Sequence, residues 1–144
     1  MHVKIKVSFE KDKDFERISK VILHEVKIHN PKYINIIFVD ESSDLPGIWN
    51  NVDWNLEQKY VKEITFNNQS KGEIDNFLIG CMKVIPNANI SEVILNGFNN
   101  KILNSVFEQS WEDLKAVKWL RIENTENLKF KTLKKLKENS IVSN

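Results

Sequence analysis

The sequence predicts an α/β domain in which strands alternate with helices and most of the sheet is parallel. Four strand-like stretches begin at residues 33, 61, 90 and 117, so they recur in steps of 28, 29 and 27 residues. Apolar residues at helical spacing follow the second and the third of these stretches. Strands and helices that alternate in this way form parallel neighbours joined by right-handed crossovers. The length of 144 residues predicts a single domain over 1–144.

The chain opens with a strand predicted over 3–9, where apolar residues alternate with lysine and serine. Lysines on its solvated face favour a place at the edge of the sheet. The run 33–39 is apolar on both faces, which is typical of a central strand covered on both sides. The stretches 61–67, 90–96 and 117–124 alternate more regularly. In the last of them, Leu120 and Ile122 face one way, and the opposite face carries Trp119, Arg121 and Glu123.

Four helices are predicted from the spacing of apolar residues. The first begins near Asp14 and ends before Pro31. The second begins at Ser70 or Gly72, is stopped by Pro86, and has a wide apolar stripe: Ile74, Phe77, Leu78, Cys81, Met82 and Ile85. The third is short and has the apolar residues Ile102, Leu103, Val106 and Phe107. The last spans 126–137, and the tail 141–144 is expected to fray.

Two local features stand between these elements. Ser110 and Asp113 resemble a capping box in which Asp replaces the usual Glu. Residues 40–60 have the least regular pattern in the chain, which predicts either a functional loop or a short hidden helix over 53–60.

Composition limits the classes of function. A net charge of +1 gives the whole molecule no strong attraction to nucleic acid or to an anionic membrane. The single cysteine, Cys81, excludes an intrachain disulfide and a cysteine zinc cluster. The first residues lack the apolar core of a signal peptide, and no apolar run approaches the roughly 18 residues of a membrane span. We therefore expect a soluble, cytoplasmic protein with no membrane contact.

The stretch 107–124 resembles a leucine-rich repeat. Its apolar ladder positions are occupied by Trp111, Leu114, Val117, Leu120 and Ile122, and Asn124 is displaced by one residue from the asparagine position. The period of 27–29 residues favours a short β/α solenoid of this kind. Earlier repeats depart from the pattern, because Val, Ile and Phe replace leucine and Gln69 and Phe98 stand near the asparagine position. An ordinary α/β sandwich with a coincidental period is the alternative.

The resemblance implies that outward strand side chains line a surface for a protein partner. We expect a middle row of Ile37, Thr65, Ile94 and Arg121. We expect two flanking rows, the first of Asn35, Glu63, Glu92 and Trp119, the second of Val39, Asn67, Asn96 and Glu123. Trp119 and Arg121 are the strongest candidates, because Trp and Arg are enriched in interface hot spots. If a helix covers this face, Ile37, Ile94 and Trp119 are instead core residues.

A second candidate surface is acidic. Residues 40–63 contain six acidic residues and two lysines. With two tryptophans in the same segment, they would suit a basic protein partner, which acidic patches steer electrostatically. The candidate residues in this segment, apart from Glu63, are Asp40, Glu41, Asp44, Trp49 and Trp54. A catalytic or metal-binding role for Asp40, Glu41 and Asp44 is the alternative, although no partner base accompanies them.

Other chemistry is poorly represented. The four glycines stand apart at 47, 72, 80 and 97, so no glycine-rich phosphate loop is present. His24 and His29 are five residues apart and do not share a helix face as zinc ligands would. Cys81 lies in an apolar stripe, where thiols are inert. We therefore predict no catalytic residue, no metal and no cofactor.

The sequence therefore predicts a non-enzymatic protein-binding module. In size, composition and lack of catalytic motifs it resembles the immunity proteins that neutralise bacterial toxins, and this resemblance implies a basic toxin domain as partner. A structural or scaffold repeat protein and an enzyme using carboxylates near Asp40 are the alternatives. Nucleic-acid binding through the lysines of the last helix is not favoured, because neither arginine nor more than one aromatic residue accompanies them.

Overall fold

The computed structural model describes residues 2–8, 20, 22–24, 26–28, 30–40, 48–53, 62–71, 74–82, 84–87, 89–115, 117–125 and 140–143. For 2–8, 48–53 and 140–143 the description is of the backbone.

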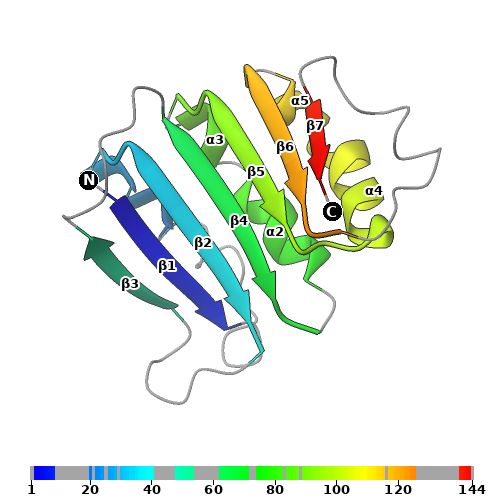
Figure 1. The fold of residues 1–144 in the computed structure, drawn as a ribbon. Coiled ribbons are helices and arrows are strands. Elements are labelled where there is room, and N and C mark those ends of the chain that lie inside the picture. The colour runs from blue at the N-terminus through cyan, green and yellow to red at the C-terminus, as the bar shows by residue number, and fades with distance from the viewer. Residues whose placement is uncertain are drawn as a thin grey trace.

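The described strands form one seven-stranded sheet (Figure 1). The strands are β1 (His2–Ser8), β2 (Tyr33–Val39), β3 (Ile48–Asp53), β4 (Glu63–Gln69), β5 (Glu92–Asn96), β6 (Trp119–Glu123) and β7 (Ser140–Ser143). Their order across the sheet is β3-β1-β2-β4-β5-β6-β7. All neighbours are parallel except β3, which runs antiparallel to β1. The predicted α/β fold with a mostly parallel sheet is confirmed.

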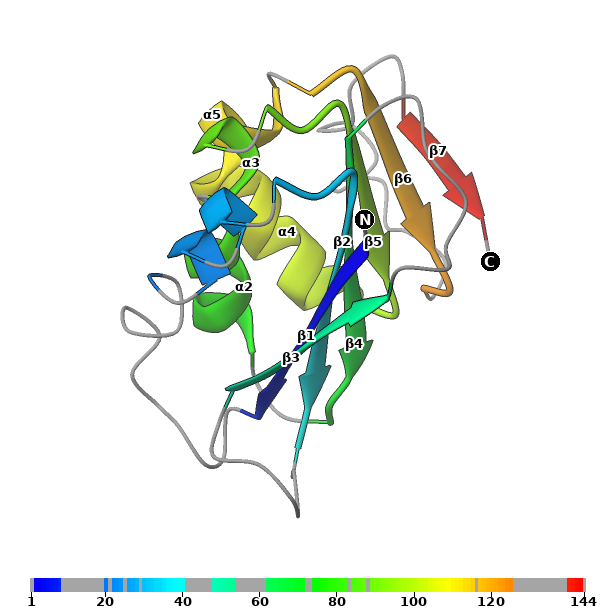
Figure 2. The same ribbon diagram turned by 90° about the vertical axis from the view of Figure 1, so that its left-hand side faces the viewer.

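The described helices lie together on one side of this sheet (Figure 2). They are the helical residues within 20–28, α2 (Asp75–Cys81), α3 (Val84–Asn87), α4 (Asn100–Gln109) and α5 (Trp111–Leu114). The one-sided arrangement follows from strand order. Successive parallel strands are added in one direction from β2 to β6, and right-handed crossovers then place every connecting helix on the same face.

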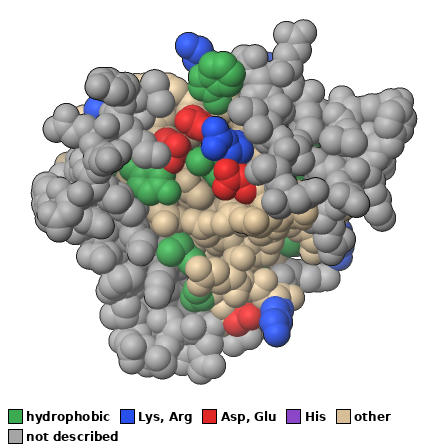
Figure 3. Space-filling model, in the orientation of Figure 1, with side chains coloured by type: hydrophobic (Ala, Val, Ile, Leu, Met, Phe, Trp, Pro, Cys, Tyr) green, Lys and Arg blue, Asp and Glu red, His purple; other side chains and the backbone are tan. Residues whose placement is uncertain are grey.

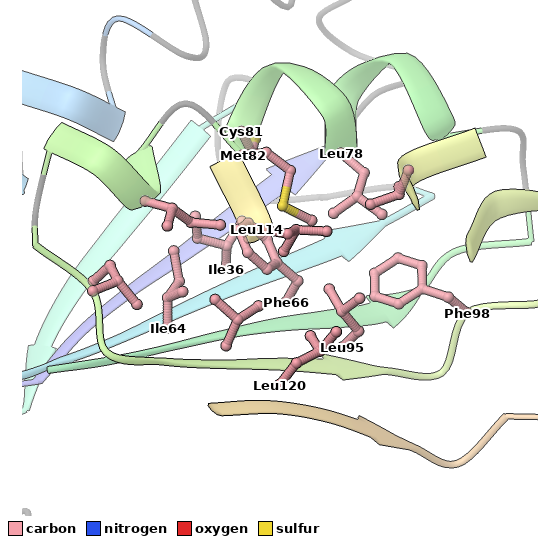
Figure 4. Close-up of a cluster of buried hydrophobic side chains, with 14 of the residues drawn as sticks. Ile36, Ile64, Phe66, Leu78, Cys81, Met82, Leu95, Phe98, Leu114 and Leu120 are labelled. Carbon is pink, nitrogen blue, oxygen red and sulfur yellow. The ribbon is translucent and has the colours of Figure 1, made fainter. Parts of the chain in front are cut away.

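The core lies between the sheet and these helices (Figure 4). Every second residue of the central strands points into it, as the two-residue period of a strand requires. These side chains are fully buried: Ile34, Ile36, Phe38, Ile64, Phe66, Val93, Leu95, Leu120 and Ile122. Leu78, Cys81 and Met82 meet them from the helix layer. Each such aliphatic side chain contributes about 1.5–3 kcal/mol by leaving water.

The edges of the sheet differ from prediction. The opening strand is not an edge strand, because β3 pairs with its outer side. Within the irregular segment 40–60, β3 was not predicted, since its sequence lacks a two-residue apolar period. The predicted fraying tail is also wrong, because Ser140–Ser143 pairs with β6. Edge strands form through backbone hydrogen bonds, which a side-chain pattern does not reveal.

Two predictions about the helices are also wrong. The stripe from Ile74 to Ile85 spans two helices, and Pro86 lies inside α3 instead of ending a helix. Proline is tolerated there because the first turn of a helix needs no N–H donor. Ser110 precedes α5, but its side chain forms no cap hydrogen bond. Its backbone, at φ −118° and ψ 17°, lacks the extended conformation of a side-chain cap.

Two predicted helices, over 53–60 and 126–137, lie outside the described residues apart from position 53, which belongs to β3. Among the described helices, none has the length and apolar character needed to cross a membrane. The consecutive order of the parallel strands is the order that a β/α solenoid would have. The leucine-rich-repeat resemblance stays a prediction.

Candidate protein-binding face

The face of the sheet opposite the described helices carries the predicted rows of side chains. Parallel pairing places three rows across β4, β5 and β6: Glu63, Glu92, Trp119; Thr65, Ile94, Arg121; and Asn67, Asn96, Glu123. These three rows agree with the predicted ones. We call this surface the open face.

The predicted place of β2 in these rows is wrong by two residues. Tyr33, not Asn35, is paired with Glu63, and Asn35 is paired with Thr65. The observed strands begin at 33, 63, 92 and 119, so the step from β2 to β4 is 30 residues. That connection contains β3, and its length therefore does not follow the repeat of the later units.

The side chains of the open face are buried to different degrees from strand to strand. Trp119 is 40% exposed, whereas Glu63, Thr65 and Ile37 are at most 6% exposed. Ile94 is intermediate. Of the three residues that would be core under a covering helix, Ile37 is buried, Ile94 is intermediate and Trp119 is exposed. The accessible part of the face lies over β5 and β6.

Trp119 stands at the amino-terminal end of β6. Its backbone N–H donates to the carbonyl oxygen of Ser91 at 3.0 Å, which holds the start of β6 against β5. The ammonium of Lys118 lies 5.8 Å from the centre of the indole ring, within reach of a cation–π interaction. Beside the ring is a hollow of about 270 Å³, lined by Glu92, Trp119, Leu120 and Arg121.

Arg121 lies between two carboxylates. Its Nη2 is 3.8 Å from Oε1 of Glu92, and its Nη1 is 3.5 Å from Oε1 of Glu123. Because the guanidinium is partly exposed, each pair contributes no more than about 1 kcal/mol to stability. Its Nε is buried and has no hydrogen-bond partner in the described part of the chain. Arg121 is therefore flanked by two carboxylates, and Glu63 is paired in register with Glu92 one strand further on.

These charges form a visible group (Figure 3). Seen from the open face, acidic and basic side chains gather beside a hydrophobic side chain in the upper half of the view. Figure 1, in the same orientation, shows the amino-terminal ends of β4, β5 and β6 in that region.

A ladder of asparagine side chains crosses the other half of the open face. Asn67 donates through Nδ2 to Oδ1 of Asn35 at 2.5 Å, and Asn96 donates to Asn67 at 2.5 Å. Asn124, in the left-handed conformation just after β6, donates to Asn96 at 2.8 Å. This ladder was not predicted. Its signal in the sequence is the recurrence of asparagine at 35, 67, 96 and 124, close to the repeat step.

Two described residues of the acidic segment, Asp40 and Trp49, lie away from this site, whereas Glu63 at its end lies in the row with Glu92. Asp40 lies just beyond the carboxyl end of β2, where its Oδ1 accepts hydrogen bonds from Ser70 Oγ at 2.6 Å and from the Lys71 N–H at 3.1 Å. Its carboxylate therefore anchors the turn after β4. Trp49 belongs to β3, which four strands separate from β6, a distance of roughly 24 Å across the sheet. Glu41, Asp44 and Trp54 lie outside the described residues.

Residues suited to catalysis or metal binding do not gather in the described structure. Burial raises the pKa of Cys81 to about 12, so its thiol stays protonated and unreactive at neutral pH. His24 is exposed. No group of three or more His, Cys, Asp or Glu side chains within the described ranges could hold a metal ion.

Comparison with protein-family models, with curated proteins and with solved structures finds no match to this chain.

Proposed function

We propose that this protein is a binding module that engages a basic protein partner through the accessible part of its open face. The observation that carries the proposal is the exposed Trp119 beside a hollow that Glu92 and Arg121 also line. Tryptophan and arginine are among the residue types most enriched in interface hot spots. The core of the protein gives Trp119 no reason to be aromatic, because its side chain points away from the helices.

The charges around the hollow support a basic partner. Glu92 and Glu123 flank Arg121, and Glu63 is in the same row as Glu92, so three carboxylates face the two cations Arg121 and Lys118 in this region. A lysine or arginine of the partner can lay its aliphatic stem against the indole and bring its charged end to Glu92. The acidic surroundings also speed the encounter with a basic surface.

The asparagine ladder supports the same proposal through rigidity. Its three hydrogen bonds tie β2, β4, β5 and the end of β6 together in the half of the open face away from the hollow. A surface held in one arrangement before binding loses less conformational entropy when the partner docks. The ladder therefore serves as the fixed platform on which Trp119 and Arg121 are presented.

A narrower form of the proposal is a toxin immunity protein. Its partner would be a basic nuclease-like domain, whose cationic surface the carboxylates of the open face would cover. We do not include Asp40 among the proposed contact residues, because its carboxylate accepts hydrogen bonds from Ser70 and Lys71. Non-enzymatic action and a cytoplasmic location remain part of the proposal.

Retention of a partner from lysate of the source cells tests the proposal. Immobilised wild type is compared with Trp119→Ala, with Arg121→Glu and with the control Glu112→Ala. Glu112 is highly exposed on α5, on the helix side of the sheet. We expect wild type and the control to retain the same single protein at equal stoichiometry.

Trp119→Ala should lose that protein at moderate salt while its circular dichroism stays unchanged. Arg121→Glu removes the cation and should alter the salt dependence of retention. Equal retention by all four proteins would contradict the use of the open face. Loss from the Glu112→Ala control alone would place the contact on the helix side instead.

A further inference from the structure

A second hollow, larger than the one at Trp119, lies on the helix side of the sheet. Its volume is about 650 Å³. It is bounded by the helical residues within 20–28 and by the turns that precede β2, β4 and β5. Figure 2 shows that helical segment on the same side as α2 to α5, away from the open face. The described residues that line it are Lys20, Leu23, His24, Val26, Lys27, Asn30, Lys62 and Asn89.

The lining is basic. Lys20, His24 and Lys27 are separated by four and three residues, so they share one face of the helix. Lys62 comes from the turn before β4 and lines the same hollow. Among the described lining residues there is no carboxylate. Lys20 and Lys27, two turns apart on this helix face, and Lys62 give the hollow three positive charges that an anion would offset.

One of the lysines, Lys62, is held in place by a hydrogen bond. Its Nζ donates to Oδ1 of Asn30 at 2.6 Å, and this bond links the turn before β4 to the turn before β2. Asn30 in turn donates its N–H to the carbonyl oxygen of Val26 at 2.9 Å, at the end of the helical segment. Lys62 is therefore tethered beside the hollow by Asn30.

The hollow also has an apolar wall and uncharged donors. Val26, which is buried, and Leu23, which is partly buried against the core, also line the hollow. The left-handed backbones of Asn30 and Asn89, with φ of 42° and 53°, place both asparagines in the turns at the rim. Their amides can donate hydrogen bonds to an anion.

We infer that this hollow binds a small organic phosphate that carries at least two negative charges. Lysine binds phosphate as a point charge. Several lysines from two segments of the chain therefore suit a ligand whose negative charges lie on more than one phosphate or carboxylate group. A volume of about 650 Å³ falls within the usual range for small-molecule sites and exceeds the need of a single phosphate ion. The apolar wall fits the organic part of such a ligand. The inference does not depend on the proposed protein contact, which uses the other face.

Calorimetric titration of the full chain tests this inference. The probes are inorganic phosphate, tripolyphosphate and phenyl diphosphate, all at the same ionic strength. The variant is Lys27→Gln/Lys62→Gln, and the matched control is Lys71→Gln/Lys101→Gln, which removes the same charge from two exposed lysines outside the hollow. Thermal unfolding of each variant confirms that it is folded.

We expect one site per chain, with phenyl diphosphate and tripolyphosphate bound more tightly than inorganic phosphate. The variant should weaken binding of both by at least about tenfold, because it removes two charge-assisted hydrogen bonds, whereas the control should stay within about twofold. Equal weakening by both double variants, or no saturable binding to wild type, would overturn the inference. Tighter, steeply salt-dependent binding of a 20-base-pair DNA duplex, lost in the same variant, would also overturn it in favour of nucleic acid.

Discussion

Asn96 donates a hydrogen bond from Nδ2 to Oδ1 of Asn67 at 2.5 Å, between two residues that are paired in register on β5 and β4. Asn67 is thus both acceptor and donor, since it also donates to Asn35. These strands are joined by backbone hydrogen bonds within the sheet, and the asparagine side chains add a second set of hydrogen bonds between them on the open face. This relationship makes the ladder cooperative, and Asn67 is its central member.

Asn67→Ala should therefore lower the free energy of unfolding by about 1–3 kcal/mol, because Asn35 and Asn96 each lose a partner in a partly buried place. Urea denaturation monitored by circular dichroism measures the loss. The control is Gln69→Ala, an exposed position on the same strand, for which we expect a change within about 0.5 kcal/mol. Equal effects at both positions would show that the ladder adds nothing beyond strand propensity.

Two adjacent residues of β6 test the assignment of the two faces. Leu120 is fully buried among the core residues, and Leu120→Ala should cost about 2–5 kcal/mol of stability. Trp119→Ala removes a larger side chain but from the open face, where it is 40% exposed, and should cost less than Leu120→Ala. Thermal unfolding of the two variants side by side provides the measurement. A larger loss for Trp119→Ala than for Leu120→Ala would mean that Trp119 belongs to the core.

The buried thiol of Cys81 predicts a dependence of stability on pH. Its pKa is raised from 9.0 to about 12 in the folded chain, so the unfolded chain loses this proton first as pH rises. The corresponding contribution to stability is complete below pH 9 and is lost between pH 9 and 12, at up to about 1.4 kcal/mol per pH unit. Urea denaturation of wild type and Cys81→Ala at pH 8 and pH 10.5 measures it. Parallel losses in the two proteins would contradict the protected thiol.

Asp40 and Ser70 should be energetically coupled. Asp40→Ala removes the acceptor for Ser70 Oγ and for the Lys71 N–H, and we expect a loss of about 1.5–3 kcal/mol. Ser70→Ala removes one of those donors. In a double-mutant cycle measured by denaturation, the double variant should be more stable than the sum of the single losses predicts. Strict additivity would show that the Asp40 carboxylate does not anchor this turn.

Prediction from the sequence succeeded where apolar and polar residues alternate regularly along a strand. Leu120 and Ile122 point into the core and Trp119 and Arg121 away from it, as the two-residue alternation requires. The register among β4, β5 and β6 also followed, because their connections have nearly equal lengths. It failed for β2, where the connection to β4 contains an extra strand and shifts the pairing by two residues.

Other features depend on contacts that no local pattern contains. β3 and β7 are edge strands whose place is set by backbone pairing with β1 and β6. The basic hollow brings Lys62 beside Lys20 and Lys27, which are at least 35 residues away in the chain. Asp40 was grouped with other acids because they are neighbours in sequence, but its carboxylate is committed to a turn 30 residues away. Each of these juxtapositions arises from the sheet order.

Site-specific photo-crosslinking tests most directly the claim that the open face is the binding surface. A benzophenone amino acid replaces Arg121 in one protein and Glu112, on the opposite side of the sheet, in another. After irradiation in lysate of the source cells, the proposal predicts one basic protein attached at position 121, none at position 112, and competition by unlabelled wild type but not by Trp119→Ala. Attachment of the same protein at position 112 and not at 121 would contradict the claim.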